Sequence, residues 1–211
     1  MIAADMVRGL LTGAVLWSDK FLLYLSTDGD FHAQIVYLCL QPAVLAYTYY
    51  YAVQCPGLNI LISRFHGAVE KEDLKLLRKR SREVSVSLTR SLFRAGAVGV
   101  LLILSITLLV KVINPQEVYT VAAIAVASWM FMMLTLLCYE LDHAGDRVSA
   151  LVLSALHLLA AVGIFFTVGG MTAYLPLAAI DVVLCVVAYV IYRIRWSRPE
   201  YTFFWGKAVG W

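Results

Sequence analysis

Long runs of apolar residues constrain this chain more than any other feature of its sequence. Between positions 92 and 192 these runs follow one another with short breaks, and each is close to the ~20 residues that a helix needs to cross a bilayer. Apolar residues make up 62% of the 211 positions and charged residues 15%, against about 45–50% and 25% in a soluble domain. This composition excludes a water-soluble globular domain and a disordered chain. The short alternating segments of an outer-membrane barrel are missing.

The runs predict an all-α fold, a polytopic membrane helix bundle of about six transmembrane helices. The spans that we expect are residues 7–25, 34–62, 92–113, 118–139, 149–168 and 172–192. A hydrophilic segment, 64–91, separates the second span from the third, and a basic, aromatic tail covers 194–211. One structural domain therefore contains two membrane parts, 1–63 and 92–193, with a cytoplasmic helix between them and a cytoplasmic tail.

The distribution of positive charge predicts the orientation of the bundle. If the N-terminus is cytoplasmic, 15 of the 17 Lys and Arg residues lie on the cytoplasmic side, nine of them between Arg64 and Arg94. The outer segments contain Lys111 alone, and Lys20 lies inside the first span. Because cytoplasmic loops carry an excess of Lys and Arg, we expect both termini to be cytoplasmic.

Asp19 and Lys20 form a charged pair inside the first predicted span. A charge in the middle of a bilayer costs at least about 2.5–3.5 kcal/mol on insertion scales. Two interpretations carry equal weight. Either Lys20 extends to the outer surface and Asp19 neutralises it, or both side chains face a hydrated path and touch a substrate.

His157 and Asp181 lie near the centres of the last two predicted spans. They are nearly equally far from the turn at Gly169 and Gly170, so an antiparallel hairpin places them at one depth. Such a pair can exchange a proton or hold a cation. The alternatives are a structural hydrogen bond that locks the two helices, or a protonated Asp181 bonded to a carbonyl. Equal depth alone does not bring the two side chains together.

Two prolines interrupt the second predicted span, Pro42 after Gln41 and Pro56 after Cys55. Proline frees a backbone carbonyl, and such breaks are tolerated where the backbone is buried or lines a cavity. Gln41 is therefore a candidate for a polar path, although a kinked packing helix is the commoner outcome. The tyrosines from 47 to 51 favour an interfacial aromatic belt over a sugar-binding surface.

The hydrophilic segment predicts an amphipathic helix with a basic stripe. One helical face carries Lys71, Lys75, Arg78 and Arg82, and another carries Leu77, Val84, Leu88 and Leu92. We expect the stripe to contact anionic lipid headgroups, and docking of a cytoplasmic partner is the alternative. Nucleic-acid binding is not expected, because the rule on orientation already accounts for these basic residues.

No residue pattern indicates catalysis, a metal centre or a cofactor. The one group with the side chains of a metal site is Glu140, Asp142, His143 and Asp146, but its spacing matches no strong signature, and we expect a solvated loop. The motifs of serine hydrolases, zinc proteases and phosphate-binding loops are missing. The four cysteines contain no CxxC pair and are expected to be buried apolar residues. We therefore expect a protein that is not an enzyme.

Several stretches resemble the PelG-like transporters, the membrane-spanning components of Pel exopolysaccharide machinery. The stretches are residues 16–21 with Trp17, Asp19 and Lys20 in a Trp-x-Asp-Lys pattern, 37–54 with its internal proline, the charged helix, 137–142 and 198–203. The resemblance implies the flippase superfamily that includes MATE exporters and lipid-linked sugar flippases. Its members have two six-helix lobes around a central cavity, so this chain resembles the C-terminal lobe alone.

The resemblance implies a lobe that exports an exopolysaccharide across a bacterial cytoplasmic membrane. The polar path would run between two lobes, so a missing N-terminal lobe or a second chain is needed. Further partners would be membrane lipid, a cytoplasmic glycosyltransferase and membrane scaffold proteins. Two alternatives stay open. One is a non-transporting membrane scaffold that docks the glycosyltransferase through residues 64–91, and the other is a drug or lipid-linked sugar flippase of the same superfamily.

Overall fold

The computed structural model describes residues 18–29, 32–69 and 74–197, and these residues are helical almost throughout, with no strand among them. The α-helices after the helical segment 18–26 are α2 (Ala33–Tyr49), α3 (Cys55–Val69), α4 (Leu74–Ile113), α5 (Val118–His143), α6 (Arg147–Thr167) and α7 (Tyr174–Ser197). A π-helix, η1 (Tyr50–Gln54), joins α2 to α3, and short 3₁₀ turns, η2 (Pro115–Glu117) and η3 (Met171–Ala173), precede α5 and α7. The predicted all-α fold is confirmed.

Four described helical stretches are long and apolar enough to cross a membrane. They are Lys75–Ile113, Pro115–His143, Arg147–Thr167 and Met171–Ser197. The last three coincide with predicted spans. The first predicted span lies mostly outside the described residues, and α2 has 17 residues before the π-helix begins. The fold is therefore a membrane-type helical bundle with four candidate spans, and a total of six stays a prediction.

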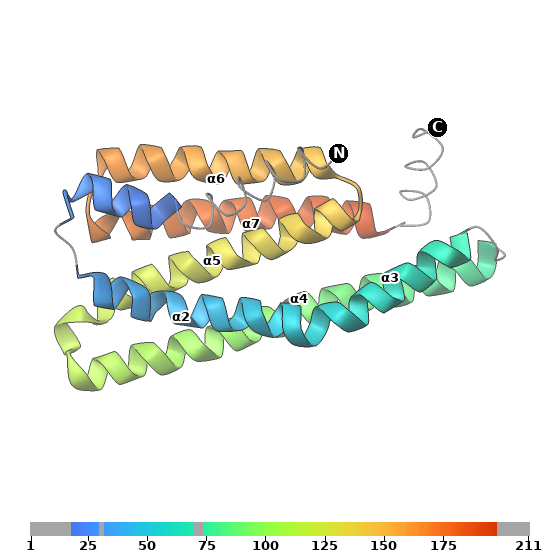
Figure 1. The fold of residues 1–211 in the computed structure, drawn as a ribbon, viewed down its shortest axis with the longest axis horizontal. Coiled ribbons are helices and arrows are strands. Elements are labelled where there is room, and N and C mark those ends of the chain that lie inside the picture. The colour runs from blue at the N-terminus through green and yellow to red at the C-terminus, as the bar shows by residue number, and fades with distance from the viewer. Residues whose placement is uncertain (1–17, 30–31, 70–73, 198–211) are drawn as a thin grey trace.

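Helices α5, α6 and α7 form a bundle with the segment 18–26 (Figure 1). The pair α5 and α7 has the most extensive packing in the described chain. Leu23 from the first segment joins Ile124, Phe165 and Tyr174 in one apolar core, and each of these side chains is at most 1% exposed. This core fixes the depth of the N-terminal segment against α6 and α7.

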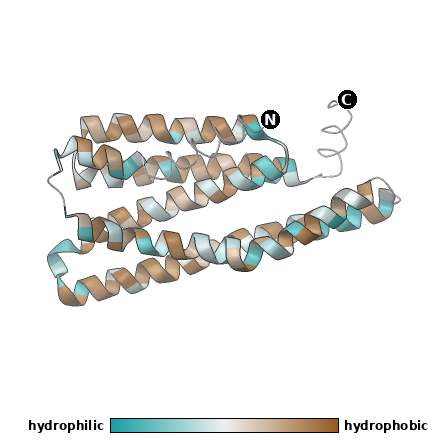
Figure 2. Ribbon diagram, in the orientation of Figure 1, coloured by the Kyte–Doolittle hydropathy of each residue, from teal (hydrophilic) through white to brown (hydrophobic). Residues whose placement is uncertain are grey.

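Helices α3 and α4 form an antiparallel hairpin that continues past the ends of α5 and α7 (Figure 1). We had expected residues 64–91 and 92–113 to be two helices, but α4 runs unbroken for 40 residues. No proline lies between Leu74 and Ile113, so the backbone ladder has no reason to break there. Figure 2 shows hydrophilic residues alternating with apolar ones along the projecting part, whereas the bundle is mostly apolar.

The π-helix lies directly before Pro56. The backbone N–H of Cys55 donates to the carbonyl of Tyr50, five residues back. A proline ring crowds the carbonyl four residues earlier and offers it no N–H, and the wider π turn accommodates this. Pro42 lies inside α2 without ending the helix. Of the two predicted interruptions, only the second changes the type of helix.

Candidate functional site

His157 of α6 and Asp181 of α7 meet in the interior of the bundle. The distance from His157 Nδ1 to Asp181 Oδ1 is 2.6 Å, and the two residues are 1% and 0% exposed. The ring of Phe131 from α5 stacks on the imidazole, with 4.2 Å between ring centroids. His157 and Asp181 therefore lie at one depth, as expected, and are also in direct contact, which the sequence alone could not predict.

The pair leaves one polar atom unsatisfied. Asp181 Oδ2 is buried and has no hydrogen-bond partner in the described part of the chain. Buried carboxylates usually have both oxygens satisfied, because an unpaired buried acceptor costs about 1–3 kcal/mol.

Asp19 and Lys20 lie in the same region. Asp19 is 6% exposed, and the Lys20 ammonium contacts Asp19 Oδ2 directly. The side chain of Lys20 is 11% exposed, so it lies against its partner and does not extend outward. Asp19 Oδ1 is another buried oxygen without a hydrogen bond among the described residues. Asp19 therefore neutralises Lys20, as the first interpretation expects, but Lys20 does not extend outward. A hydrated path with a bound substrate stays a prediction.

Asp19 connects the two pairs. The hydroxyl of Tyr174, at the start of α7, interacts electrostatically with Asp19, yet has no hydrogen bond of normal geometry in the described chain. Asp19 is also close enough to Asp181 for their charges to interact. We call Asp19, Lys20, His157, Tyr174 and Asp181 the polar centre. It draws on the N-terminal segment, α6 and α7. Tyr174 is not among the residues that the sequence pattern predicts for a site.

Gln41, the other path candidate that the structure describes, does not join the polar centre. It is exposed on α2, and its Nε2 donates to the carbonyl of Tyr37 at 3.4 Å. Trp17 lies outside the described residues. In this conformation His157 and Asp181 are too deeply buried to touch a polymer directly.

The prediction of a solvated loop around Glu140 is wrong. Helix α5 continues to His143, and Glu140 is 1% exposed. The Tyr50 hydroxyl of the π-helix donates to Glu140 Oε1, and the indole Nε1 of Trp196 donates to the backbone carbonyl of Glu140 at 3.2 Å. His143 Nδ1 is 3.7 Å from Glu140 Oε2. The partners that cover this residue are 90 and 56 positions away in the sequence. No local sequence pattern therefore predicts its burial.

Asp146 caps α6 at the end of the bundle that lies beside Glu140. Its Oδ1 accepts from the backbone N–H of Ser149 at 3.2 Å, and its Oδ2 accepts from Arg195 Nε at 2.6 Å. Burial raises the pKa of the Asp146 carboxyl, but the hydrogen bonds from Arg195 and Ser149 outweigh burial and hold the pKa below its ordinary value. This contact joins α7 to the α5–α6 turn.

The basic stripe is present and exposed on α4. Lys75, Arg78 and Arg82 are exposed, and Lys71 lies outside the described residues. The apolar face opposite is buried in one core with residues of α3, and Leu88 is 0% exposed. The expected amphipathic helix exists, but α3 already covers the apolar face with which such a helix would enter a bilayer.

No comparison with known proteins identifies a family. The chain matches no family model, and neither a curated protein nor a solved structure matches it. The likeness to PelG-like transporters therefore stays a hypothesis, and the argument for function depends on the geometry of the chain itself.

The polar centre has the chemistry of proton or cation exchange. A histidine and a carboxylate in contact can share a proton, and intramembrane ionisable residues commonly mark ion pathways. Among the described residues, no group of three or more His, Cys, Asp or Glu side chains could hold a metal ion. What the centre offers instead is two acid–base pairs in an apolar surrounding.

Proposed function

We propose that this chain is one lobe of a membrane transporter, and that the polar centre couples movement of the helices to uptake and release of a proton or cation. The observation that carries the proposal is the contact between His157 and Asp181, inside helices that are long and apolar enough to cross a membrane. An ionisable group is costly inside a membrane, and where one occurs it commonly marks a functional site.

The position of these groups favours transport over a static lock. Asp19, His157 and Asp181 come from three different helical segments, and each is at most 6% exposed. When helices part, the same side chains become the lining of a hydrated space, as alternating access requires. The closed polar centre is then one of two states.

The resemblance supplies the substrate class. PelG-like transporters suggest export of an exopolysaccharide, and a partly de-acetylated, cationic polymer suits the carboxylates of Asp19 and Asp181. On this proposal the chain has six passes with both termini in the cytoplasm of a bacterium, spans the inner membrane, and pairs with a second six-helix lobe. A glycosyltransferase in the cytoplasm supplies the polymer.

Polymer secretion tests the proposal. Asp181→Asn, and separately Asp19→Asn with Lys20→Met, are compared in a secreting host with Asp28→Asn, an exposed aspartate outside the polar centre. We expect both polar-centre variants to assemble in the membrane and to lose secretion, with the control unaffected. Normal secretion by assembled polar-centre variants contradicts the path and favours the non-transporting scaffold.

A further inference from the structure

The exposed side of α4 changes character along one continuous stripe. Residues at helical spacings of three, four and seven share a face, and this face carries Lys75, Lys79, Arg82, Val86, Phe93, Val100 and Leu104. All seven side chains are exposed. The stripe is cationic in the projecting hairpin and apolar beyond Phe93, which is 77% exposed. The change marks where α4 passes from water into lipid.

The position of this change fixes how far the basic end lies from the membrane. Arg94 is the last cation before the apolar stretch of α4. At 1.5 Å per residue, Arg82 lies about 18 Å and Lys75 about 28 Å beyond it along the axis. A tilt of about 20° shortens these values by only a few per cent. The headgroup layer is only ~5–8 Å thick, and charges are screened beyond ~8 Å.

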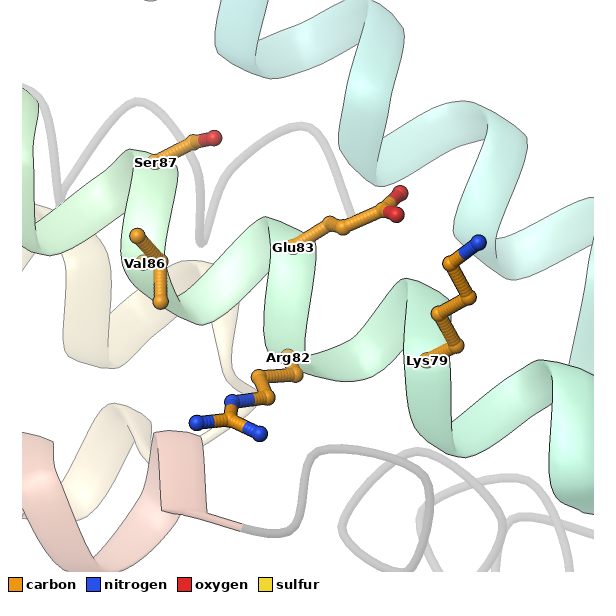
Figure 3. A pocket seen from close by; sticks show the side chains of 5 residues that line it. All are labelled: Lys79, Arg82, Glu83, Val86 and Ser87. Atoms are coloured by element: carbon orange, nitrogen blue, oxygen red, sulfur yellow. The ribbon is translucent and has the colours of Figure 1, made fainter.

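A shallow, open hollow lies along the basic end of α4. Its volume is about 380 Å³, and it is lined by Lys79, Arg82, Glu83, Val86 and Ser87. Figure 3 shows Glu83 directed to the same side as Lys79, with the Arg82 side chain diverging from both. Between Lys75 and Arg82 the sequence has five cations and no carboxylate, whereas Glu70, Glu72 and Asp73 precede this stretch and Glu83 follows it. Lys79 and Arg82 have no ion-pair partner in the described chain.

We propose that this hairpin end binds an acidic segment of a water-soluble protein. Its cations are out of reach of lipid headgroups, and its apolar face is already used by α3. The exposed cations Lys75, Lys79 and Arg82 suit the carboxylates of a partner. The exposed apolar side chains Leu76 and Val86, 45% and 48% exposed, suit a polypeptide with apolar residues among its acids. The Glu83 carboxylate can accept hydrogen bonds from the backbone N–H groups of a peptide, which a nucleic-acid backbone lacks.

The proposal is independent of transport by the polar centre, because it depends only on α4 crossing the membrane. The test uses the whole chain in nanodiscs of phosphatidylcholine, so that no anionic lipid is present. The probe is a short fluorescent amphipathic peptide of Glu and Leu, and anisotropy measures its binding. Two matched pairs of exposed α4 cations are neutralised: Lys79→Gln with Arg82→Gln in the hollow, and Arg90→Gln with Arg94→Gln near the membrane.

We expect the wild-type chain to bind the peptide, with affinity falling as salt is raised. Neutralising Lys79 and Arg82 removes two exposed ion pairs with the peptide and should weaken its binding about fivefold. Neutralising Arg90 and Arg94 should change the affinity less than about twofold. Equal losses in the two pairs overturn the proposal, and so does an absence of binding to the wild-type chain. Tighter binding of a single-stranded DNA probe of similar charge also overturns it.

Discussion

The bundle and the projecting hairpin follow opposite rules of burial. In the bundle, Asp181 and His157 are inside and large apolar side chains such as Leu159 and Leu175 are 68% exposed. In the hairpin, Leu88 and Val84 are inside and the cations are outside. A single solvent cannot favour both arrangements. We infer from the difference that the two regions fold against different media, lipid for the bundle and water for the hairpin.

Helix α4 belongs to both regions, so the two can be compared along one continuous helix. Its buried face stays apolar on both sides of Arg94, because α3 packs against one half and α2 and α5 against the other. Only its outward face changes. The surrounding medium, and not the neighbouring helices, therefore sets the exposed residues.

The largest expected effect is in the polar centre. His157→Leu leaves Asp181 unpaired, and removing one member of a buried pair costs about 3–5 kcal/mol of unfolding free energy. Because a well-packed apolar pair avoids that charge, His157→Leu with Asp181→Leu should lose less than the single variant. Unfolding in detergent micelles measures both, with the exposed His32→Leu as control. A double variant that is less stable than His157→Leu contradicts a mutual pairing.

Leucine truncation tests the hairpin against the bundle on one helix. Leu88→Ala in α4 removes a side chain that is 0% exposed and should cost about 2–5 kcal/mol of unfolding free energy. Leu104→Ala, on the same helix but 53% exposed, should cost under about 1 kcal/mol in micelles. Thermal unfolding compares the two. Similar costs would mean that the outward face of α4 packs on protein and not on lipid.

The join between the two regions is a close approach of α4 and α5. A Cβ at Gly99 would lie 2.4 Å from Trp129 Cδ1, so Gly99→Ala must displace an indole ring. We expect a loss of about 1–3 kcal/mol. Gly163→Ala in α6 meets nothing within 4 Å and should gain up to about 1 kcal/mol from helix propensity. Equal effects of the two substitutions on unfolding would show that no tight contact exists at Gly99.

The smallest expected effect is a pH dependence at Asp146. Its pKa is lowered in the folded chain, so the carboxylate stabilises folding above the ordinary pKa of about 3.9 and this contribution is lost as the pH falls below that value. Asp146→Asn keeps the helix cap but removes the ion pair, at a cost of about 0.5 kcal/mol. Thermal unfolding should separate the two chains at neutral pH and not in strong acid. A gap that persists in strong acid contradicts this origin.

The helices of the bundle could be predicted because hydropathy is a local property. Runs at 118–139, 149–168 and 172–192 match α5, α6 and α7, since each run is apolar between two polar turns. The depth of His157 and Asp181 also followed from simple counting. Their facing did not, because side-chain direction depends on how α6 rotates against α7, which packing alone decides.

Two features were missed for the same physical reason. Glu140 reads as part of a polar turn, but Tyr50 and Trp196 arrive from distant positions to cover it. The continuity of α4 was missed because a change from charged to apolar residues looks like a boundary between helices. On our account it is the position at which the surrounding medium changes, and the α4 helix continues unbroken through it.

The most direct measurement follows the outward stripe of α4 through that boundary. Spin labels at positions 79, 86, 93, 100 and 104 of the chain in nanodiscs report contact with a water-soluble nickel complex or with oxygen dissolved in lipid. Our account predicts that nickel dominates at Lys79 and Val86, that oxygen dominates at Val100 and Leu104, and that the two cross near Phe93. A stripe on which one reagent dominates from end to end would contradict the division of the molecule between water and lipid.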